Sequence, residues 1–318
     1  MNYGFWEKLR RPFFVLAPMA DVTDAAFRKI IVECGRPDVF YTEFISADGL
    51  VSAGRERLIK DLVYTDAEHP IVAQFFGSKP ENFFKCAQLA RELGFDGVDI
   101  NMGCPDRKVV KQGAGIGLLK TPELAQEIIT AAKEGAGSLP VSVKTRLGYA
   151  NIDLEWMRTL LETKIPVLAV HGRTMKEMSK VPVHWDAISE AASIAKAYGT
   201  LVIGNGDVLS REDGISKARE FNLDGIMVGR GIFQNPWLFD SKINPETVSI
   251  SERLSLLLKH TVYFKELWGD FKSFNLMKKF YKIYVSGWDG AKDLRTQLMN
   301  TKDENEVGEI IRKYLRGL

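Results

Sequence analysis

One cysteine stands where the chain is expected to turn directly after an apolar run. Cys104 lies in the segment NMGCP (101–105), in which glycine and proline favour a turn that exposes the thiol. A thiol with a pKa of about 8.5 is mostly protonated at neutral pH, so it can donate a proton as well as act as a nucleophile. The other two cysteines, Cys34 and Cys86, lie in segments with helical periodicity and are predicted to be core residues.

Polar residues and a glycine end several other apolar runs. They are Gln74, Asn101, Lys144, Arg146, His171, Arg173, Asn205, Asp207, Gly229 and Arg230. Any one of them is explained by a satisfied buried polar group or by a salt bridge at a rim. The same pattern at the ends of six successive runs favours an active site, because such residues cluster at the carboxyl ends of barrel strands.

Two of these strand ends combine glycine with polar residues, in GNG (204–206) and GRG (229–231). Glycine lets backbone N–H groups approach an anion closely, and Arg230 adds a fork of donors for phosphate oxygens. The ligand this implies is a phosphorylated cofactor whose ring lies over the carboxyl ends of the strands. Gln74 can bond the edge of such a ring and Lys144 can stabilise negative charge on it, as for a reduced flavin.

Eight short apolar runs alternate with segments of helical periodicity, and their continuous apolar character is typical of parallel strands buried on both faces. Thr121 before Pro122 and Ser210 before a further helix are expected to be caps. Eight such β-then-α units predict an α/β fold, a (β/α)8 TIM barrel, with a doubly wound open sheet as the alternative. The runs are 13–20, 39–44, 70–76, 97–104, 141–147, 167–173, 200–207 and 225–231.

The pattern changes to helical periodicity alone after residue 240. We therefore predict a catalytic barrel domain over 1–240 and an all-helical domain over 241–318. The helical part carries 14 Lys and Arg against 10 Asp and Glu, although the net charge of the whole chain is only +2. This basic excess fits a polyanion partner, and it also fits a solvated helix face.

Composition and missing motifs exclude several other classes. With 45% apolar and 26% charged residues, the chain has an ordinary globular composition. It has no apolar run as long as a membrane span and no signal-peptide core, so a cytoplasmic protein is expected. It has no GxSxG, P-loop or HExxH motif and no CxxC pair. No metal is expected, because no metal-ligand spacing links His69, His171, His184 and His260.

Seven segments of the predicted barrel resemble the dihydrouridine synthases, the FMN-dependent family that reduces uridine in tRNA. NxGCP, KxR, HGRT, NGD and GRGxxxNPW in this order form a specific pattern, and the helical tail resembles the family's RNA-binding domain. The chain departs from the family in MKEMS (175–179) and at Ile116 and Gly117. The matching segments are APMADVTDAAFR (17–28), VAQFFG (72–77), DGVDINMGCPDRKV (96–109), VKTRLG (143–148), AVHGRT (169–174), VIGNGD (202–207) and GIMVGRGIFQNPWLF (225–239).

The resemblance implies roles for particular residues. It makes Cys104 the general acid, while Asn101 and Arg146 recognise uracil. It implies tightly bound FMN, with Gln74 at the polar edge of the ring, His171 beside the ring and Lys144 between flavin and substrate. The other cofactor-binding residues that it implies are Pro18, Met19 and Ala20 along the ring, and Asn205, Gly206, Asp207, Gly229 and Arg230 at the ribityl and phosphate groups.

The chemistry implied is reduction of the uracil C5–C6 bond, which is conjugated to the C4 carbonyl. Hydride from the flavin adds at C6, and Cys104 protonates C5 from the opposite face. The base must first leave the RNA stack. By the same resemblance NADPH is the reductant, tRNA the partner and a monomer the expected state.

Two other functions remain open on the sequence alone. An FMN barrel acting on a free pyrimidine shares the flavin residues but leaves the helical tail without a role. A non-catalytic RNA-binding protein that keeps its flavin as structure is the second, and it would be indifferent to loss of Cys104. Ribosomal RNA is an alternative polynucleotide substrate.

Overall fold

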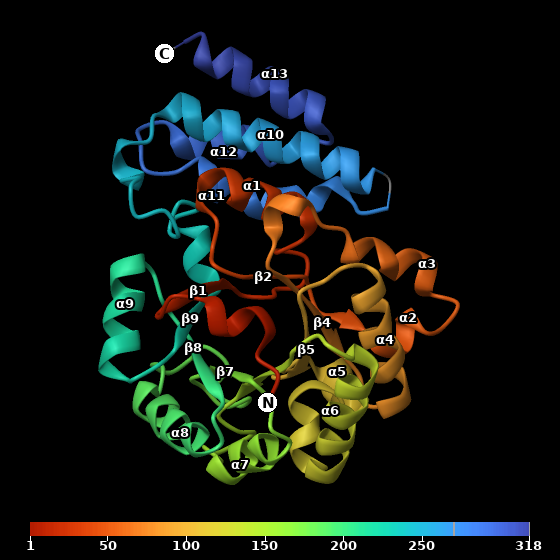
Figure 1. The fold of residues 1–318 in the computed structure, drawn as a ribbon. Coiled ribbons are helices and arrows are strands. Elements are labelled where there is room, and N and C mark those ends of the chain that lie inside the picture. Colours follow the sequence, from red (N-terminus) through yellow and green to blue (C-terminus); the bar gives the residue numbers. More distant parts are fainter. Residues whose placement is uncertain (270, 318) are drawn as a thin grey trace.

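The barrel is closed by parallel strands. The structure is a computed structural model that describes residues 1–269 and 271–317. Over these residues nine strands form one parallel sheet in the order β1-β9-β8-β7-β6-β5-β4-β2, with β3 on β4, and a bridge between Val15 and Val39 closes the ring (Figure 1). The strands are β1 (Phe13–Leu16), β2 (Phe40–Tyr41), β3 (Ile45–Ser46), β4 (Ile71–Phe76), β5 (Gly97–Met102), β6 (Val141–Arg146), β7 (Val167–His171), β8 (Leu201–Asn205) and β9 (Gly225–Val228).

Each of the eight predicted runs contains one strand, so the predicted TIM barrel is confirmed over the open sheet. All of these strands except β4 end earlier than the apolar runs do. The run 13–20, for example, is strand only to Leu16, because Pro18 has no N–H group for the ladder. Several polar residues, among them Lys144, His171 and Asn205, lie near the ends of the strands, and others, such as Cys104 and Asp207, lie in the loops that follow.

Helices follow the strands around the outside of the barrel (Figure 1). Asp213 N donates to Ser210 Oγ at 3.0 Å, which confirms that cap. Thr121 also stands at the N-cap of α6, but its hydroxyl donates to the Leu118 carbonyl instead of accepting from the first turn. The main helices are α1 (Ala25–Gly35), α4 (Pro80–Glu92), α6 (Pro122–Ala136), α7 (Leu154–Glu162), α8 (Trp185–Ala197) and α9 (Arg211–Glu220). Shorter helices in the loops are α2 (Ala47–Leu50), α3 (Arg55–Leu58) and α5 (Arg107–Lys111), with 3₁₀ turns η1 (Gly4–Lys8), η2 (Ile59–Leu62), η3 (Asp66–Glu68), η4 (Gly115–Lys120) and η5 (Arg230–Phe233).

The amino-terminal segment fills the barrel from the end opposite the polar loops. Trp6 of η1 is buried, and its ring centroid lies 5.5 Å from that of Phe13, within the cluster of side chains that fills the barrel interior. The Tyr3 hydroxyl donates to the Gly199 carbonyl at 2.5 Å and fastens the segment to the α8–β8 loop. The interior is thus a packed core, and the carboxyl ends of the strands are left to form a site.

The carboxy-terminal part is helical, as predicted, and packs on α1 (Figure 1). The ring of Phe27 on α1 lies 5.1 Å from that of Phe280 and 5.5 Å from that of His260, so barrel and helices share one hydrophobic cluster. The boundary at residue 240 stays a prediction. None of the described helices is long and apolar enough to cross a membrane. The elements are η6 (Pro245–Thr247), α10 (Ile250–Trp268), η7 (Phe274–Phe280), α11 (Tyr281–Tyr284), α12 (Ala291–Leu298) and α13 (Glu304–Leu315).

Candidate active site

A cavity of about 290 Å³ opens at the carboxyl ends of β1, β6, β7, β8 and β9. Met178 and Ser179, from the loop that departs from the family pattern, also reach it. The chain thus brings together, from segments as far apart as residues 18 and 230, most of the residues that sequence singled out. The predicted site residues on the cavity wall are Pro18, Met19, Lys144, Arg146, His171, Asn205, Gly206, Asp207, Gly229 and Arg230.

Four predicted residues do not line this cavity. Ala20 faces a second cavity, of about 540 Å³, between the barrel and the helical part. Gln74 is fully buried, and its amide bonds within the protein: Nε2 donates to Asp99 Oδ2 at 2.7 Å and Oε1 accepts from Asn101 Nδ2 at 2.9 Å. The side-chain oxygen of Asn101, Oδ1, accepts from the backbone N–H groups of Gly103 and Cys104, at 3.1 and 2.8 Å. Gln74 and Asn101 therefore build the turn that carries Cys104.

The thiol of Cys104 sits in an apolar surrounding. Its side chain packs with Val109 and Ala114 and against the half-buried rings of Phe44 and Phe76, and only 8% of the residue is exposed. Burial raises the pKa of Cys104, while a hydrogen bond from the Asp106 backbone and the charges of Arg146 and Lys144 oppose the rise and the Asp106 carboxylate adds to it. The group is therefore a neutral thiol at physiological pH, which suits a proton donor rather than a thiolate nucleophile.

Glycine is required next to this turn. Gly115 has φ +59°, and a Cβ there would lie 2.7 Å from the carbonyl oxygen of Cys104. A larger residue would push the loop off the cysteine in addition to straining its own backbone. The GAGIG run, which sequence did not assign to the site, thus shapes the surroundings of Cys104.

Asp99 is a buried site residue that the sequence analysis missed. Its carboxylate accepts from Ser142 Oγ and from Gln74 Nε2, and burial raises its pKa to about 6. An unbroken chain of hydrogen bonds runs from Asp99 through Gln74 and Asn101 to the backbone of Cys104. The signal that could have found it is a carboxylate in the middle of the apolar run GVDIN (97–101).

Three basic side chains gather on the cavity wall. Burial, and then the charge of Arg146, lower the pKa of Lys144 to about 8. Arg146 Nε donates to the Gly103 carbonyl at 2.9 Å, which ties β6 to the turn of Cys104. Burial and the nearby Arg146 and Lys144 hold the pKa of His171 far below its usual value, so this ring is neutral. Arg146 Nη1 lies 3.2 Å from His171 Nδ1, which makes Nδ1 the acceptor and leaves the proton on Nε2.

An arginine pair surrounds Asp207 at the end of the cavity formed by β8 and β9. The carboxylate bonds Arg173 and, at 2.7 Å, Arg230, and the bond from Arg173 is the main reason that its pKa is lowered. Asp207 therefore positions two cations here. Arg173 is only 2% exposed, and its Nη1 has no hydrogen-bond partner among the described residues. A Cβ at Gly231 would lie 2.1 Å from the Val208 carbonyl oxygen, so glycine allows the two loops to touch.

The closed parallel barrel with a polar cavity at the carboxyl ends of its strands defines the class of (β/α)8-barrel proteins. A variant of NCR from Zymomonas mobilis shares this fold at 16% identity and a TM-score of 0.50, over 76% of this chain and 90% of that chain. TcOYE with pHBA matches with a TM-score of 0.53 at 12% identity, over 72% and 87% of the two chains. At these identities the likeness shows the fold.

The sequence relatives are more specific. The family model described as dihydrouridine synthase matches residues 15–317. The probable tRNA-dihydrouridine synthase 2 of Bacillus subtilis strain 168 is 46% identical over 331 aligned positions, which cover 100% of both chains. A probable tRNA-dihydrouridine synthase of Staphylococcus epidermidis is 44% identical over 98% of this chain and 96% of its own. The chain belongs to the dihydrouridine synthase family, a family of flavin-dependent oxidoreductases, and the resemblance seen in the motifs is confirmed.

Proposed function

We propose that the protein reduces uridine to 5,6-dihydrouridine in tRNA, with FMN bound in the cavity at the barrel mouth and NADPH as the reductant. The observation that carries the proposal is the neutral thiol of Cys104, held by a dedicated hydrogen-bond chain beside a cavity lined by cations. A proton donor next to groups that stabilise negative charge is what addition of hydride and proton to uracil requires.

The residues of the cavity fit FMN. The unpartnered, buried Nη1 of Arg173 and the fork of Arg230 offer donors for a phosphate, and Asp207 holds both arginines in place. Asn205, Gly206 and Gly229 would contact the ribityl and phosphate groups, and Pro18 and Met19 would line the ring. When bound, the flavin supplies the hydride that adds to uracil C6.

Cys104 would hold the proton at Sγ and deliver it to C5 from the face opposite the hydride. Its raised pKa keeps that proton in place at neutral pH. Lys144 would stabilise charge that develops on the uracil carbonyl, and the neutral His171 would offer its Nε2–H beside the ring. Asn101 and Arg146 would orient the base, in addition to the backbone contacts that both make around Cys104.

We assign the barrel, residues 1–240, to catalysis and the helical part, 241–318, to RNA binding. The uridine must leave its stack to reach Cys104, which costs a few kcal/mol that contacts to phosphates and to the base must offset. The excess of basic residues in the helical part supports such contacts. We propose that the protein acts as a monomer in the cytoplasm.

Mapping dihydrouridine in the RNA of cells with and without this gene tests the proposal. We expect particular tRNA positions to lose the modification, and to regain it with purified protein, FMN and NADPH. Loss of dihydrouridine from ribosomal RNA alone would make ribosomal RNA, not tRNA, the substrate. Reduction of free uracil or uridine at rates matching those on tRNA would favour a free pyrimidine, and unchanged dihydrouridine in all RNA would refute the proposal.

The affinity for FMN is expected to fall as pH rises through about 8. Lys144 is charged below its pKa of about 8 and neutral above it, and a cation binds the anionic cofactor better. Flavin fluorescence titrations between pH 6.5 and 9.5 measure the effect. The variant Lys144→Arg should keep high affinity throughout this range, since guanidinium stays charged. An equal decline in both proteins would assign the effect to another group.

A further inference from the structure

The turn that carries Pro18 and Met19 into the cavity has several hydrogen bonds within itself. Met19 N donates to Thr23 Oγ1 at 2.8 Å, and the Met19 carbonyl accepts from the N–H groups of Val22 and Thr23, both at 3.0 Å. Asp21 lies at the tip of this turn with φ +56°, a left-handed conformation that is uncommon for residues other than glycine, although aspartate adopts it more readily than most.

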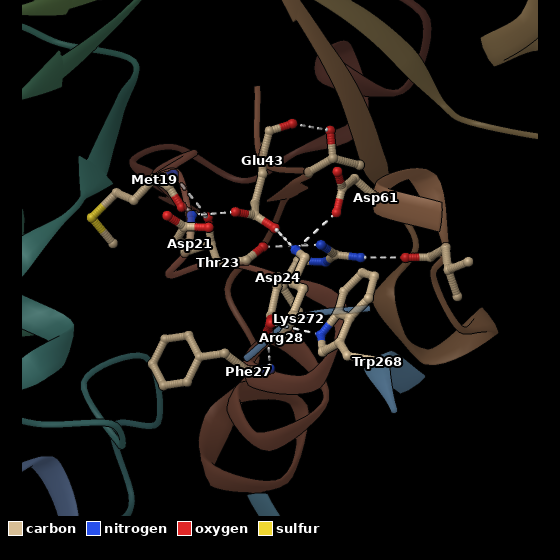
Figure 2. Close-up of polar contacts among 12 residues, drawn as sticks. Met19, Asp21, Thr23, Asp24, Phe27, Arg28, Glu43, Asp61, Trp268 and Lys272 are labelled. Atoms are coloured by element: carbon tan, nitrogen blue, oxygen red, sulfur yellow. Dashed lines mark hydrogen bonds and ion pairs between the residues drawn. The ribbon is translucent and has the colours of Figure 1, made fainter. Parts of the chain in front are cut away.

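Two hydrogen bonds hold the backbone of Asp21, one at its N–H group and one at its carbonyl. Both link it to side chains of the helical part. Its N–H group donates to the carboxylate of Glu43, and Lys272 bonds the other oxygen of that carboxylate at 3.2 Å (Figure 2). Its carbonyl accepts from Lys279 Nζ of η7 at 2.8 Å. The chain positions joined in this way are about 230 to 260 residues apart.

Glu43 is not an incidental surface carboxylate. It is 5% exposed, and burial raises its pKa to about 7 in spite of the charge of Lys272. Burial by itself lowers the pKa of Lys272, but Glu43 and Asp61 outweigh it, so Lys272 remains a cation. Lys272 also bonds Asp61 at 2.8 Å and lies 3.9 Å above the ring of Trp268. A half-buried cation bonded to two carboxylates and lying over an indole ring is well placed to hold Glu43.

A further contact joins the same parts at the other end of the turn. Asp24 caps α1 by accepting from Phe27 N at 2.9 Å, and its second oxygen accepts from Trp268 Nε1 at 2.8 Å (Figure 2). Trp268 is the last residue of α10. The turn between β1 and α1 is thus held at Asp21 and at Asp24 by side chains of the helical part.

We propose that Lys272 and Lys279, with Glu43 as intermediary, are positioning residues for the flavin site. They hold the turn at Asp21 in the conformation that presents Pro18 and Met19 to the cavity. Flavin binding in the barrel is therefore coupled to the state of the helical part, and the coupling is reciprocal. The inference rests on the proposed flavin site and assigns part of that site's affinity to residues outside the barrel.

The variant Lys272→Met tests the proposal in the full-length protein. We expect about tenfold weaker binding of FMN, measured by flavin fluorescence, because a half-buried charge-assisted hydrogen bond that supports the turn is lost. Lys259→Met is the matched control: it breaks the Lys259–Glu33 pair, 2.5 Å long, which also joins α10 to α1 but does not reach the turn. Lys259→Met should not alter FMN affinity.

Hydrogen exchange in the flavin-free protein gives a second readout. The amides of residues 21–23 should exchange faster in Lys272→Met than in wild type or in Lys259→Met, because Glu43, which accepts from the Asp21 N–H, loses its Lys272 partner. Lys279→Met changes an exposed side chain that is not part of the core, so it should fold normally and weaken FMN binding by about threefold.

The outcomes separate this inference from the function it rests on. If both Lys272→Met and Lys279→Met bind FMN within about twofold of wild type and exchange at wild-type rates, the positioning role is overturned. If wild type binds no FMN, the flavin proposal fails, and the exchange rates alone decide whether these lysines hold the turn.

Discussion

Replacing Cys104 with alanine should lower the rate of dihydrouridine formation by about 10²–10⁴-fold, the usual contribution of a positioned general acid. In the proposed mechanism the neutral thiol of Cys104 gives the proton to C5, and alanine has no proton to give. FMN should remain bound, because Cys104 does not line the cavity proposed to hold the flavin. The rate is measured on tRNA under single-turnover conditions, and the bound flavin by its visible absorbance.

The control for this variant is Cys86→Ala. Cys86 is a buried cysteine of α4 that lies outside the site, so its loss tests the effect of a missing thiol on stability alone. We expect Cys86→Ala to keep wild-type turnover. Turnover by Cys104→Ala at the wild-type rate, with flavin bound, would remove the thiol from the mechanism.

Replacing Arg28 with methionine should destabilise the protein by about 3–5 kcal/mol, since the substitution leaves a buried carboxylate without its partner. Arg28 and Glu68 form an ion pair in which both side chains are fully buried. The same guanidinium donates to the carbonyls of Thr23 at 3.0 Å and Val63 at 2.7 Å. Urea unfolding of the flavin-free protein measures the change, so that ligand binding does not contribute.

The double variant Arg28→Met/Glu68→Leu is informative beside it, because it removes the stranded charge. It should recover part of the lost free energy of unfolding. As a surface control, Arg158→Ala breaks an exposed pair with Glu155 and should cost less than about 1 kcal/mol. If Arg28→Met were no more destabilising than Arg158→Ala, the buried Arg28–Glu68 pair would not contribute to stability in the way its burial predicts.

The barrel could be predicted from sequence because parallel strands buried on both faces appear as short apolar runs, as in PIVAQFF (70–76) and TLVIGNGD (200–207). The cavity could be predicted for a similar reason, since polar residues that end successive strands of a barrel meet at one end of it. Ten of the residues named from the sequence line the cavity.

Side-chain partners could not be predicted in the same way. Gln74 and Asn101 were assigned to the flavin and to uracil, and the structure shows that their amides also support the turn of Cys104. An amide has several donors and acceptors, and which neighbours use them depends on packing between strands that sequence spacing does not encode. The same holds for Glu43, whose partner Lys272 lies 229 residues away.

The aromatic packing of Phe27 against His260 and Phe280 has a consequence for protein engineering. A chimera that transplants only the chain after residue 240 from a relative would set a foreign helix against α1 and leave mismatched rings in a shared interior. The smallest exchangeable unit is therefore discontinuous, made of α1 together with the region from α10 to α13. Grafts designed on that unit should fold with a single melting transition, whereas tail-only grafts should melt early.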